Sequence, residues 1–348
     1  MSEPPGPDIL ADGTPPEMLD MTIDSEVLER EVSPAASLTE KGTGSTADHL
    51  FRRIALAAGA TVLLALVLIA AVMIQQSWPA FSELGAGYFF GTEWRPAENL
   101  FGIIPLAFGT VVVSLIAVAF AVPVSVGIAL FITELAHRRI RGGITLVIDL
   151  LAAVPSVVFG LWGFYTLIPP FQRFFNGIAD LVEPVPVLNT LFGRGSGSSF
   201  MTAGIVLALM IIPIITSVTR EVFMTVPEND RYGALALGAT RWEMIKGVVI
   251  PHSSGGLAGA IMLGLGRAMG ETVAVALLIG ASPQVSANLF GRGETMPAQI
   301  FRSLSEAGGT FRSALIGLGV CLFVITILIN MSARRAVVII DRRIKGTH

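Results

Sequence analysis

Long apolar stretches alternate with shorter polar connections from about residue 54 to about residue 333. A run of about 20 apolar residues is needed to cross the hydrocarbon layer of a membrane. Six stretches meet this requirement, at about 54–74, 103–133, 144–168, 201–224, 255–281 and 311–333. The pattern therefore predicts an all-α membrane protein with six transmembrane helices.

Three of the predicted spans contain a proline within the apolar run, namely Pro123, Pro155 and Pro213. A proline inside a helix removes one hydrogen-bond donor and frees a carbonyl group, which a neighbouring helix or a water-filled cavity must satisfy. These positions favour a bundle built around a pathway, although kinked packing helices give the same pattern.

The distribution of basic residues predicts the orientation of the spans. Fourteen Lys and Arg residues fall in the segments 52–53, 138–141, 220–246 and 334–345, which lie on one side, and six fall in the connections on the other side. Lys and Arg accumulate in cytoplasmic loops. We therefore expect both termini in the cytoplasm and a multi-pass protein of a bacterial plasma membrane.

The first 48 residues differ from the rest of the chain. They hold eleven acidic residues against Arg30 and Lys41, whereas residues 49–348 have a balance of +6. A strongly charged segment without an apolar run cannot bury enough surface to fold. We expect a disordered acidic cytoplasmic tail at 1–48, followed by one transmembrane domain at 49–348.

Aromatic residues lie near the ends of the outer connections, at about 75–102 and 169–200. Tryptophan and other aromatic side chains are enriched where a membrane meets water. We expect the following residues to form such a belt: Trp78, Phe89, Phe90, Trp94, Phe171, Phe174 and Phe175.

Arg267 and Glu271 are isolated charges inside the fifth, glycine-rich apolar stretch. Charged residues at membrane depth cost at least about 2.5–3.5 kcal/mol each, and they usually pair or line a pathway. Residues four apart share one face of a helix, so the spacing predicts contact between the two. The flanking Gly264, Gly266 and Gly270 are expected to let neighbouring helices approach.

Residues 225–254 predict two short helices that project from the membrane domain. Pro227 and the acidic residues after it indicate a helix start, and Gly238 indicates a bend. A second helical piece runs from Arg241 to Val249 and is expected to end at Pro251. Short amphipathic helices of this kind suit the groove of another protein.

This segment resembles the EAA loop of ABC-transporter permease subunits, which reads Glu-Ala-Ala, three residues, Gly, nine residues and Ile-x-Leu-Pro. Gly238 takes the place of the glycine, Ala234 the third position, and Val248, Ile250 and Pro251 the closing residues. The run Leu-Gly-Ala239-Thr240-Arg241-Trp also matches. The chain departs from the pattern at Tyr232 and Gly233, which stand in place of Glu and the first Ala.

Two further runs make the chain similar to the phosphate-importer branch of these permeases. They are Gly-Arg267-Ala-Met-Gly-Glu271-Thr in the fifth span and Ala-Val-Pro155-Ser-Val-Val-Phe-Gly160-Leu-Trp-Gly in the third. The similarity covers roughly residues 50–340.

The resemblance implies the fold of a type I ABC importer permease that translocates inorganic phosphate and does not itself hydrolyse ATP. It implies as partners a second permease subunit, an ATPase dimer that binds the 225–254 coupling loop, and an extracytoplasmic phosphate-binding protein. The sequence agrees, because it contains no Gly-x-x-x-x-Gly-Lys-Ser/Thr phosphate loop. In this interpretation Arg267 attracts phosphate as it crosses, and Glu271 holds Arg267 in place. The alternative is an ion pair that only orients the helices.

Two other functions stay open. A permease for another oxyanion, such as sulfate or molybdate, would share the loop pattern, and an ATP-independent secondary transporter would use the charged pair as a relay. We expect no catalytic set, metal site or cofactor. Glu134, close to the basic cluster at 137–141, is expected to be an interfacial acid that snorkels or pairs, and Asp149 a structural residue that could pair with Arg139 or Arg141. The basic residues at 334–345 are expected to contact anionic lipid.

Overall fold

The computed structural model describes residues 46–344, with side chains described for 49–335. The predicted disordered tail therefore lies outside the described residues, except that a helix begins at Thr46. The chain divides into two compact units, residues 1–66 and residues 67–348. Of the first unit, the described part is the beginning of one long apolar helix, α2 (Thr46–Leu84).

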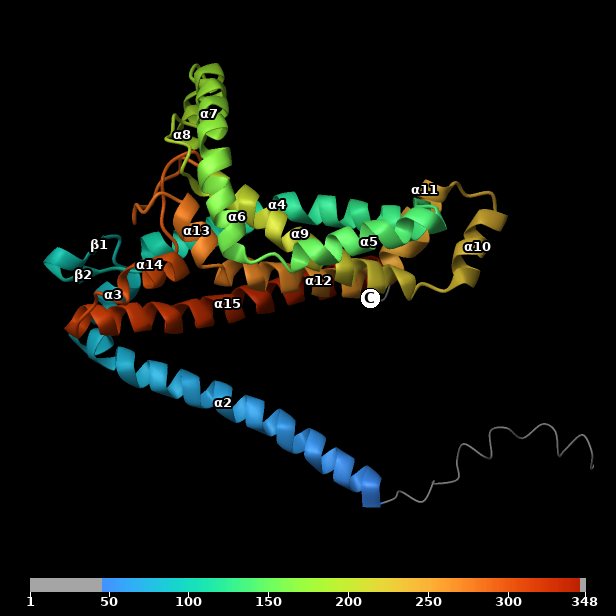
Figure 1. Cartoon of the computed structure of the whole chain (residues 1–348), viewed down its shortest axis with the longest axis horizontal. Helices are drawn as coiled ribbons and strands as arrows, with labels where there is room; N and C mark the ends of the chain where they lie inside the picture. Colours follow the sequence, from blue (N-terminus) through green and yellow to red (C-terminus); the bar gives the residue numbers. More distant parts are fainter. Residues whose placement is uncertain (1–45, 345–348) are drawn as a thin grey trace, which may run out of the picture. The chain divides into compact units, whose positions relative to one another are not determined.

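Helices make up most of the described chain (Figure 1). The α-helices after α2 are α3 (Ala86–Phe90), α4 (Ile104–Leu130), α5 (Arg138–Ala152), α6 (Ser156–Trp162), α7 (Ile168–Val182), α8 (Pro186–Leu191), α9 (Phe200–Met224), α10 (Glu228–Ala236), α11 (Arg241–Met244), α12 (Ile250–Gly270), α13 (Val273–Leu278), α14 (Met296–Ser303) and α15 (Gly309–Ile344). Three π-helical turns and one 3-10 turn complete the helical elements: η1 (Pro96–Glu98), η2 (Phe131–Leu135), η3 (Gly163–Leu167) and η4 (Ile245–Val249). The strands β1 (Trp94–Arg95) and β2 (Leu100–Phe101) form one antiparallel pair, in which Trp94 lies opposite Phe101.

Five described helices are long and apolar enough to cross a membrane, and they correspond to five of the six predicted spans. Their bounds are His49–Leu84, Ile104–Leu135, Phe200–Met224, Arg241–Gly270 and Gly309–Arg335. The remaining prediction, one helix over 144–168, is wrong. The chain bends by 88° between α5 and the helix that begins at Ser156, because Pro155 adopts an extended conformation and caps α6. This bent pair forms a sixth span only if both arms are counted together.

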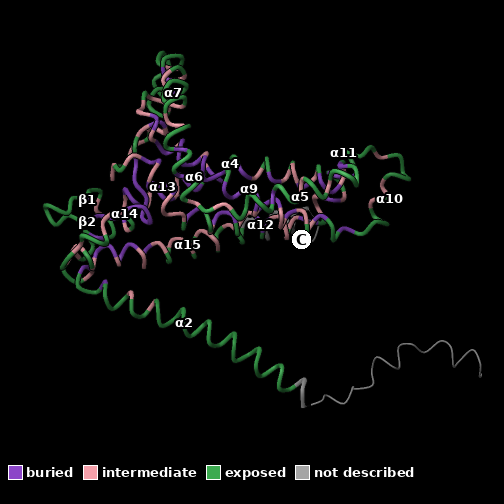
Figure 2. The backbone as a smooth tube through the Cα atoms, viewed as in Figure 1, coloured by how far each residue is buried: buried purple, intermediate pink, exposed green. Residues whose placement is uncertain are grey.

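The main core lies where α4, α9 and α12 pack against one another (Figure 2). Val113, Ala117 and Ala121 of α4 and Leu207 and Ile211 of α9 are buried there. The helices approach closely, since a Cβ atom on Gly204 would lie 2.4 Å from the Cγ2 atom of Ile116. Small residues at crossings favour close packing of helices in membranes.

Large apolar side chains remain exposed on the outer faces of the same helices. Examples are Leu115, Phe120 and Val124 on α4, and Phe323 and Leu328 on α15. An apolar surface of this extent is unusual for a protein in water and normal for one in lipid. The packing therefore agrees with the membrane assignment made from the hydrophobic pattern.

The prediction of an aromatic belt at the membrane interface is wrong for two of its residues. Trp94 is buried against Phe101 and Phe311, and Phe175 is buried with its ring stacked on Phe290 at 4.3 Å between centroids. Trp78 is exposed, as expected for a residue at a membrane interface. The Trp94 ring instead fixes the segment after α3 to α15, and the Phe175 ring fixes α7 to the connection between α13 and α14.

Candidate functional site

Arg267 and Glu271 do not share a helical face. The helix α12 ends at Gly270, and Glu271 has an extended backbone with φ −71° and ψ 126°. A carboxylate oxygen of Glu271 instead accepts a hydrogen bond from the amide of Ala274, 3.5 Å away, at the beginning of α13. The helix of the fifth predicted span therefore ends at Gly270, between the two charges, and not near residue 281 as predicted. Within the described residues, the Arg267 guanidinium has no acid at ion-pair distance.

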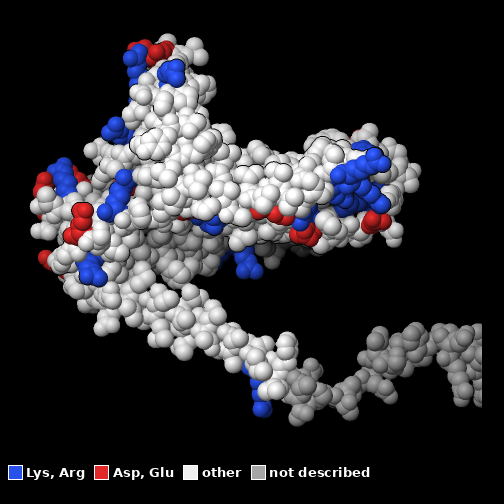
Figure 3. All heavy atoms as spheres, in the orientation of Figure 1, with Lys and Arg blue, Asp and Glu red and all other residues white. Residues whose placement is uncertain are grey.

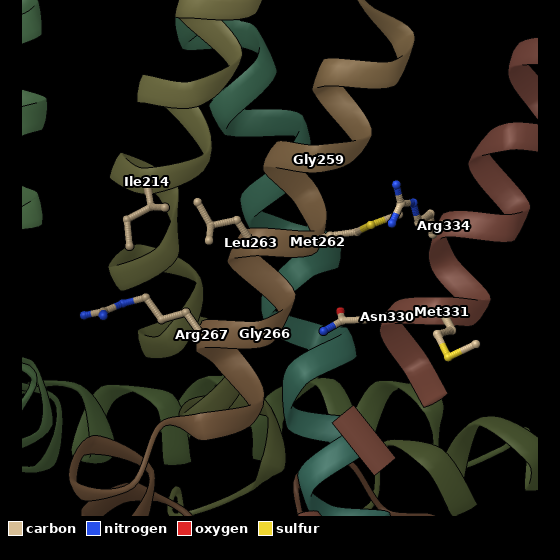
Figure 4. Close-up of a pocket in the computed structure, with 9 residues that line it drawn as sticks. All are labelled: Ile214, Gly259, Met262, Leu263, Gly266, Arg267, Asn330, Met331 and Arg334. Carbon is tan, nitrogen blue, oxygen red and sulfur yellow. The ribbon is translucent and has the colours of Figure 1, made fainter. Parts of the chain in front are cut away.

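Arg267 lines a cavity of about 750 Å³ between α9, α12 and α15 (Figure 4). Ile214, Met262 and Leu263 give it an apolar wall, and no acidic residue lines it. In Figure 4 the Arg267 side chain extends from α12 toward the side of Ile214, and Asn330 lies on the α15 side. The Oδ1 atom of Asn330 is buried without a hydrogen-bond partner among the described residues. The cavity is thus lined by two guanidinium groups, those of Arg267 and Arg334, and by an unused acceptor, among apolar side chains.

The glycines that flank Arg267 differ in what surrounds them. A Cβ atom on Gly264 would lie 2.6 Å from the Cδ1 atom of Ile215, so α12 and α9 need a glycine there. A Cβ atom on Gly270 would meet no atom within 4 Å, and one on Gly266 would meet only the Asn330 side chain at 3.9 Å. Close helix approach, expected for all three positions, is therefore a property of Gly264.

The predicted coupling loop at 225–254 contains two short helices, α10 and α11, as expected. Gly238 joins them with a φ of +87°. Its amide donates to the carbonyl of Leu235 at 3.0 Å, and the amide of Ala239 donates to the carbonyl of Ala234 at 3.2 Å. This pair of hydrogen bonds is a Schellman motif, which requires a left-handed residue after the helix and therefore favours glycine.

Beyond Gly238 the chain differs from the prediction. The helical piece from Arg241 does not end at Pro251 but continues to Gly270. The π-helical turn η4 immediately precedes the proline and widens the backbone there, so the ring fits without a break in the helix. Thr240 and Glu243 form a capping box at the start of α11, with the amide of Thr240 2.8 Å from the Glu243 carboxylate. The Thr-x-x-Glu spacing in the sequence could have revealed this cap.

The outer face of the coupling loop is apolar and uncovered. Leu237 is 91% exposed, and Tyr232 and Trp242 are also exposed. A Cβ atom on Gly233 would meet no atom within 4 Å, so the surface around it is open. The inner face packs through Ala234, Met244 and Ile245 onto Phe223 of α9 and Ala129 of α4.

An ion pair joins the coupling loop to the membrane helices. The guanidinium of Arg231 on α10 lies 3.2 Å from the carboxylate of Glu134 in η2, and both side chains are largely buried. Arg231 also donates to the carbonyl of Phe223 at the end of α9. Glu134 is therefore paired, but its partner does not come from the basic cluster at 137–141, where Arg141 donates to the carbonyl of Thr133 instead. Periodicity gave no signal for the observed pair, which connects positions almost a hundred residues apart.

A second buried ion pair lies in the connection between α13 and α15. Glu294, only 1% exposed, lies 3.2 Å from Arg302 of α14. Burial raises the pKa of Glu294 to about 7, although Arg302 and the Thr295 amide act in the opposite direction. Arg302 also donates to the carbonyl of Ala276 and so ties α14 to α13. The sequence analysis assigned a role to neither residue.

The remaining charged candidates are at the surface. Asp149 is exposed on α5 and forms no ion pair with Arg139 or Arg141. In the part of the chain that the structure describes, no three His, Cys, Asp or Glu residues cluster as metal ligands. The basic segment 334–345 lies mostly outside the described side chains.

The region that contains these features matches a known protein family. The family described as "Binding-protein-dependent transport system inner membrane component" matches residues 121–346. The chain belongs to this family. The matched region contains the coupling loop, the Arg231–Glu134 pair and Arg267, so the resemblance seen in the coupling loop is confirmed.

Curated relatives narrow the assignment to the PstC permeases. A "Phosphate transport system permease protein PstC" of Xylella fastidiosa is 42% identical over 299 residues, which cover 85% of this chain and 92% of the relative. The protein of the same name from Mesorhizobium japonicum is 40% identical, with 85% and 91% covered. A PstC 2 protein of Mycobacterium tuberculosis is 38% identical over 321 residues, with 88% and 97% covered.

A solved structure supports the fold. A chain of a bacterial ABC transporter involved in the import of the polysaccharide alginate superposes with a TM-score of 0.52 at 17% identity. The superposition covers 85% of this chain and 98% of that chain. The chain therefore has the fold of an ABC importer permease, and its family identifies it as an inner membrane component.

Proposed function

We propose that this chain is the permease subunit of an ABC importer that carries inorganic phosphate into the cytoplasm. The proposal is supported by the family assignment and by relatives that are named as phosphate transport permeases. A second permease subunit completes the pathway, and a phosphate-binding protein delivers the substrate on the outer side. A separate pair of ATPase subunits hydrolyses ATP, and this chain contributes no catalytic group.

The unpaired Arg267 guanidinium is the observation that favours an anionic substrate. A cation among apolar side chains is costly unless an anion neutralises it. A guanidinium offers a planar fork of donors that fits two phosphate oxygens. The 750 Å³ cavity is open on this face of α12, where a second permease subunit would close it. Phosphate then has no competitor for the Arg267 guanidinium, since the carboxylate of Glu271 is held by the beginning of α13.

The coupling loop provides the contact to the ATPase subunits. Its outer face presents Tyr232, Leu237 and Trp242 to the solvent, and apolar side chains on a short helix suit a groove on a partner. Its inner face packs on α4 and α9, so a displacement of α10 would be transmitted to both helices. In this arrangement the loop and both chain termini lie in the cytoplasm, as the basic residues predict.

Phosphate uptake by the assembled transporter in proteoliposomes tests the proposal. We expect Arg267→Ala to lower the uptake of radiolabelled phosphate at least tenfold, and Arg267→Lys to restore part of it because the charge is kept. Arg173→Ala on α7 is the matched control, since Arg173 is exposed and has no ion pair among the described residues. Equal uptake by Arg267→Ala and the wild type would contradict the pathway role of Arg267.

Competition distinguishes phosphate from the other oxyanions. Excess unlabelled phosphate should suppress the uptake of labelled phosphate, and equal concentrations of sulfate or molybdate should not. Uptake that persists without ATP and without the ATPase subunits would indicate a secondary transporter and overturn the proposal as a whole.

A further inference from the structure

A second cavity, of about 390 Å³, lies at the end of the helices that carries the coupling loop. Its walls come from η2, the beginning of α5 and the end of α9, and its polar lining consists of Thr133, Arg138, Arg141, Thr145, Arg220 and Glu221. Cavities that bind small ligands commonly have volumes of about 300–1,000 Å³. Figure 3 shows Lys and Arg side chains gathered at this end of the molecule.

The lining carries a net positive charge. Three guanidinium groups face one carboxylate, that of Glu221, which pairs with Arg220 and is 62% exposed. Glu134 follows Thr133 in the chain, but its carboxylate pairs with Arg231 outside this cavity. Arg138 has no ion-pair partner among the described residues. Two positive charges are therefore left without a counter-charge.

Neutral oxygen atoms hold two of the guanidinium groups in place. Arg141 donates to the carbonyl of Thr133 at 2.8 Å, and Arg220 donates to the hydroxyl of Thr145 at 3.0 Å. These bonds fix the side chains and do not neutralise them. The Nε atoms of Arg141 and Arg220 are buried and have no partner among the described residues. Buried donors and charges without partners are costly and favour an anionic ligand.

We infer that this cavity binds a phosphate group. A phosphate carries several acceptor oxygens, which suit converging guanidinium forks. The cavity also lies at the N-terminus of α5, which begins at Arg138, and the positive end of the helix dipole there favours an anion. The site is separate from the Arg267 cavity and does not depend on the substrate proposed above.

Two sources can supply this group. The cavity lies where the apolar stretches of α4 and α9 end, and basic pockets at such positions bind the head groups of anionic lipids. Free phosphate has the same oxygen acceptors and would reach the same cavity from the aqueous side. The two sources differ in whether an acyl chain accompanies the phosphate.

The assembled transporter, purified without its binding protein, allows both to be tested. Native mass spectrometry counts the molecules of phosphatidylglycerol retained from vesicles that contain phosphatidylcholine and phosphatidylglycerol. Equilibrium dialysis measures the binding of radiolabelled inorganic phosphate. The test variant is Arg138→Gln with Arg220→Gln, and the matched control is Arg139→Gln, whose side chain is exposed beside the cavity but does not line it.

We expect the double variant to bind one of the two probes at least tenfold more weakly than the wild type, and Arg139→Gln to bind it normally. Loss of one retained lipid assigns the site to a head group, and loss of phosphate binding assigns it to the free anion. Arg138→Lys with Arg220→Lys should recover part of the binding and excludes a folding defect as the cause. If the double variant and Arg139→Gln behave alike with both probes, the inference is wrong.

Discussion

Arg231 on α10 and Glu134 in η2 form a largely buried ion pair with 3.2 Å between nitrogen and oxygen. The pair connects the coupling loop to the end of α4, and the same arginine is bonded to the last turn of α9 through Phe223. Removing one partner of a buried pair leaves the other charge without compensation. The position of α10 therefore depends on these two side chains, in addition to the apolar contacts beneath it.

We predict that Glu134→Gln uncouples ATP hydrolysis from phosphate uptake. The loss of one buried charge costs about 3–5 kcal/mol in comparable pairs, which is enough to release α10 from the membrane helices. The exposed face of the loop is unchanged, so the ATPase subunits should still bind. The measurement is the ratio of phosphate imported to ATP hydrolysed in proteoliposomes.

The matched control for this variant is Glu228→Gln, which removes the same charge from an exposed position at the beginning of α10. It should retain the wild-type ratio. A normal ratio in Glu134→Gln would show that the ion pair does not hold the loop during transport.

A second prediction concerns the left-handed conformation of Gly238. A Cβ atom there would meet no atom within 4 Å, so the φ of +87° alone opposes a side chain. A left-handed conformation costs about 1–2 kcal/mol for a residue with a Cβ atom. We expect Gly238→Ala to weaken the association with the ATPase subunits, and Gly238→Asn to weaken it less, because Asn tolerates this conformation. Co-purification of the subunits measures the effect.

Gly233 provides the control for Gly238 within the same loop. It lies inside α10, where a Cβ atom would also meet nothing within 4 Å. Alanine is the better helix former by about 1 kcal/mol, so Gly233→Ala should leave the association intact. If both alanine variants lower it equally, the contact surface and not the backbone turn is responsible.

The raised pKa of Glu294 predicts that the stability of the protein depends on pH. Its pKa in the folded protein is about 7, against an ordinary value of 4.5. The folded state therefore holds an extra proton between these values, so its stability is highest below about pH 4.5 and falls as the pH rises through 7. The total change corresponds to about 3 kcal/mol. Thermal unfolding in detergent between pH 5 and pH 8 measures it.

We expect Glu294→Gln to flatten this pH profile, since glutamine does not titrate. Glu306→Gln, in the same connection but exposed and without an ion pair among the described residues, should keep the wild-type slope. A profile that keeps its slope in Glu294→Gln would assign the pH dependence to another group.

Hydrophobic length predicted most helices because burial in lipid depends on the composition of a stretch and little on its tertiary contacts. The length of the apolar stretches did not show which of the three prolines interrupts a helix. Pro123 and Pro213 lie inside the continuous helices α4 and α9, whereas α5 ends just before Pro155. The difference depends on tertiary packing, since α6 turns away to pack against α13. The pattern of residues around Pro155 does not reveal such a contact between distant helices.

The same contrast between local patterns and tertiary contacts explains why only part of the candidate site was predicted. The glycine spacing of the coupling loop is local, so the sequence located Gly238 and the bend. Partners of charged residues are not local. Glu134 and Glu294 have partners that the fold supplies, and the end of α12 separates Arg267 from Glu271.

The last prediction concerns the crossing of α12 and α9 at Gly264. A Cβ atom there would lie 2.6 Å from the Cδ1 atom of Ile215 and 2.7 Å from its Cγ1 atom, and Ile215 is fully buried. Gly264→Ala should therefore push α12 away from α9 and lower the unfolding temperature, with a cost of about 1–3 kcal/mol as for other overpacked cores. Gly259→Ala, on the open face of the same helix, should not lower it.

A double-mutant cycle identifies the cause. Ile215→Val removes the Cδ1 atom and should cost about 0.5–1.5 kcal/mol alone, but less in the presence of Gly264→Ala, because the two changes offset each other. Non-additive costs are expected only for residues in contact. Additive costs would mean that the alanine acts elsewhere, and Arg267, one turn further along α12, would then be positioned by other contacts than the one with Ile215.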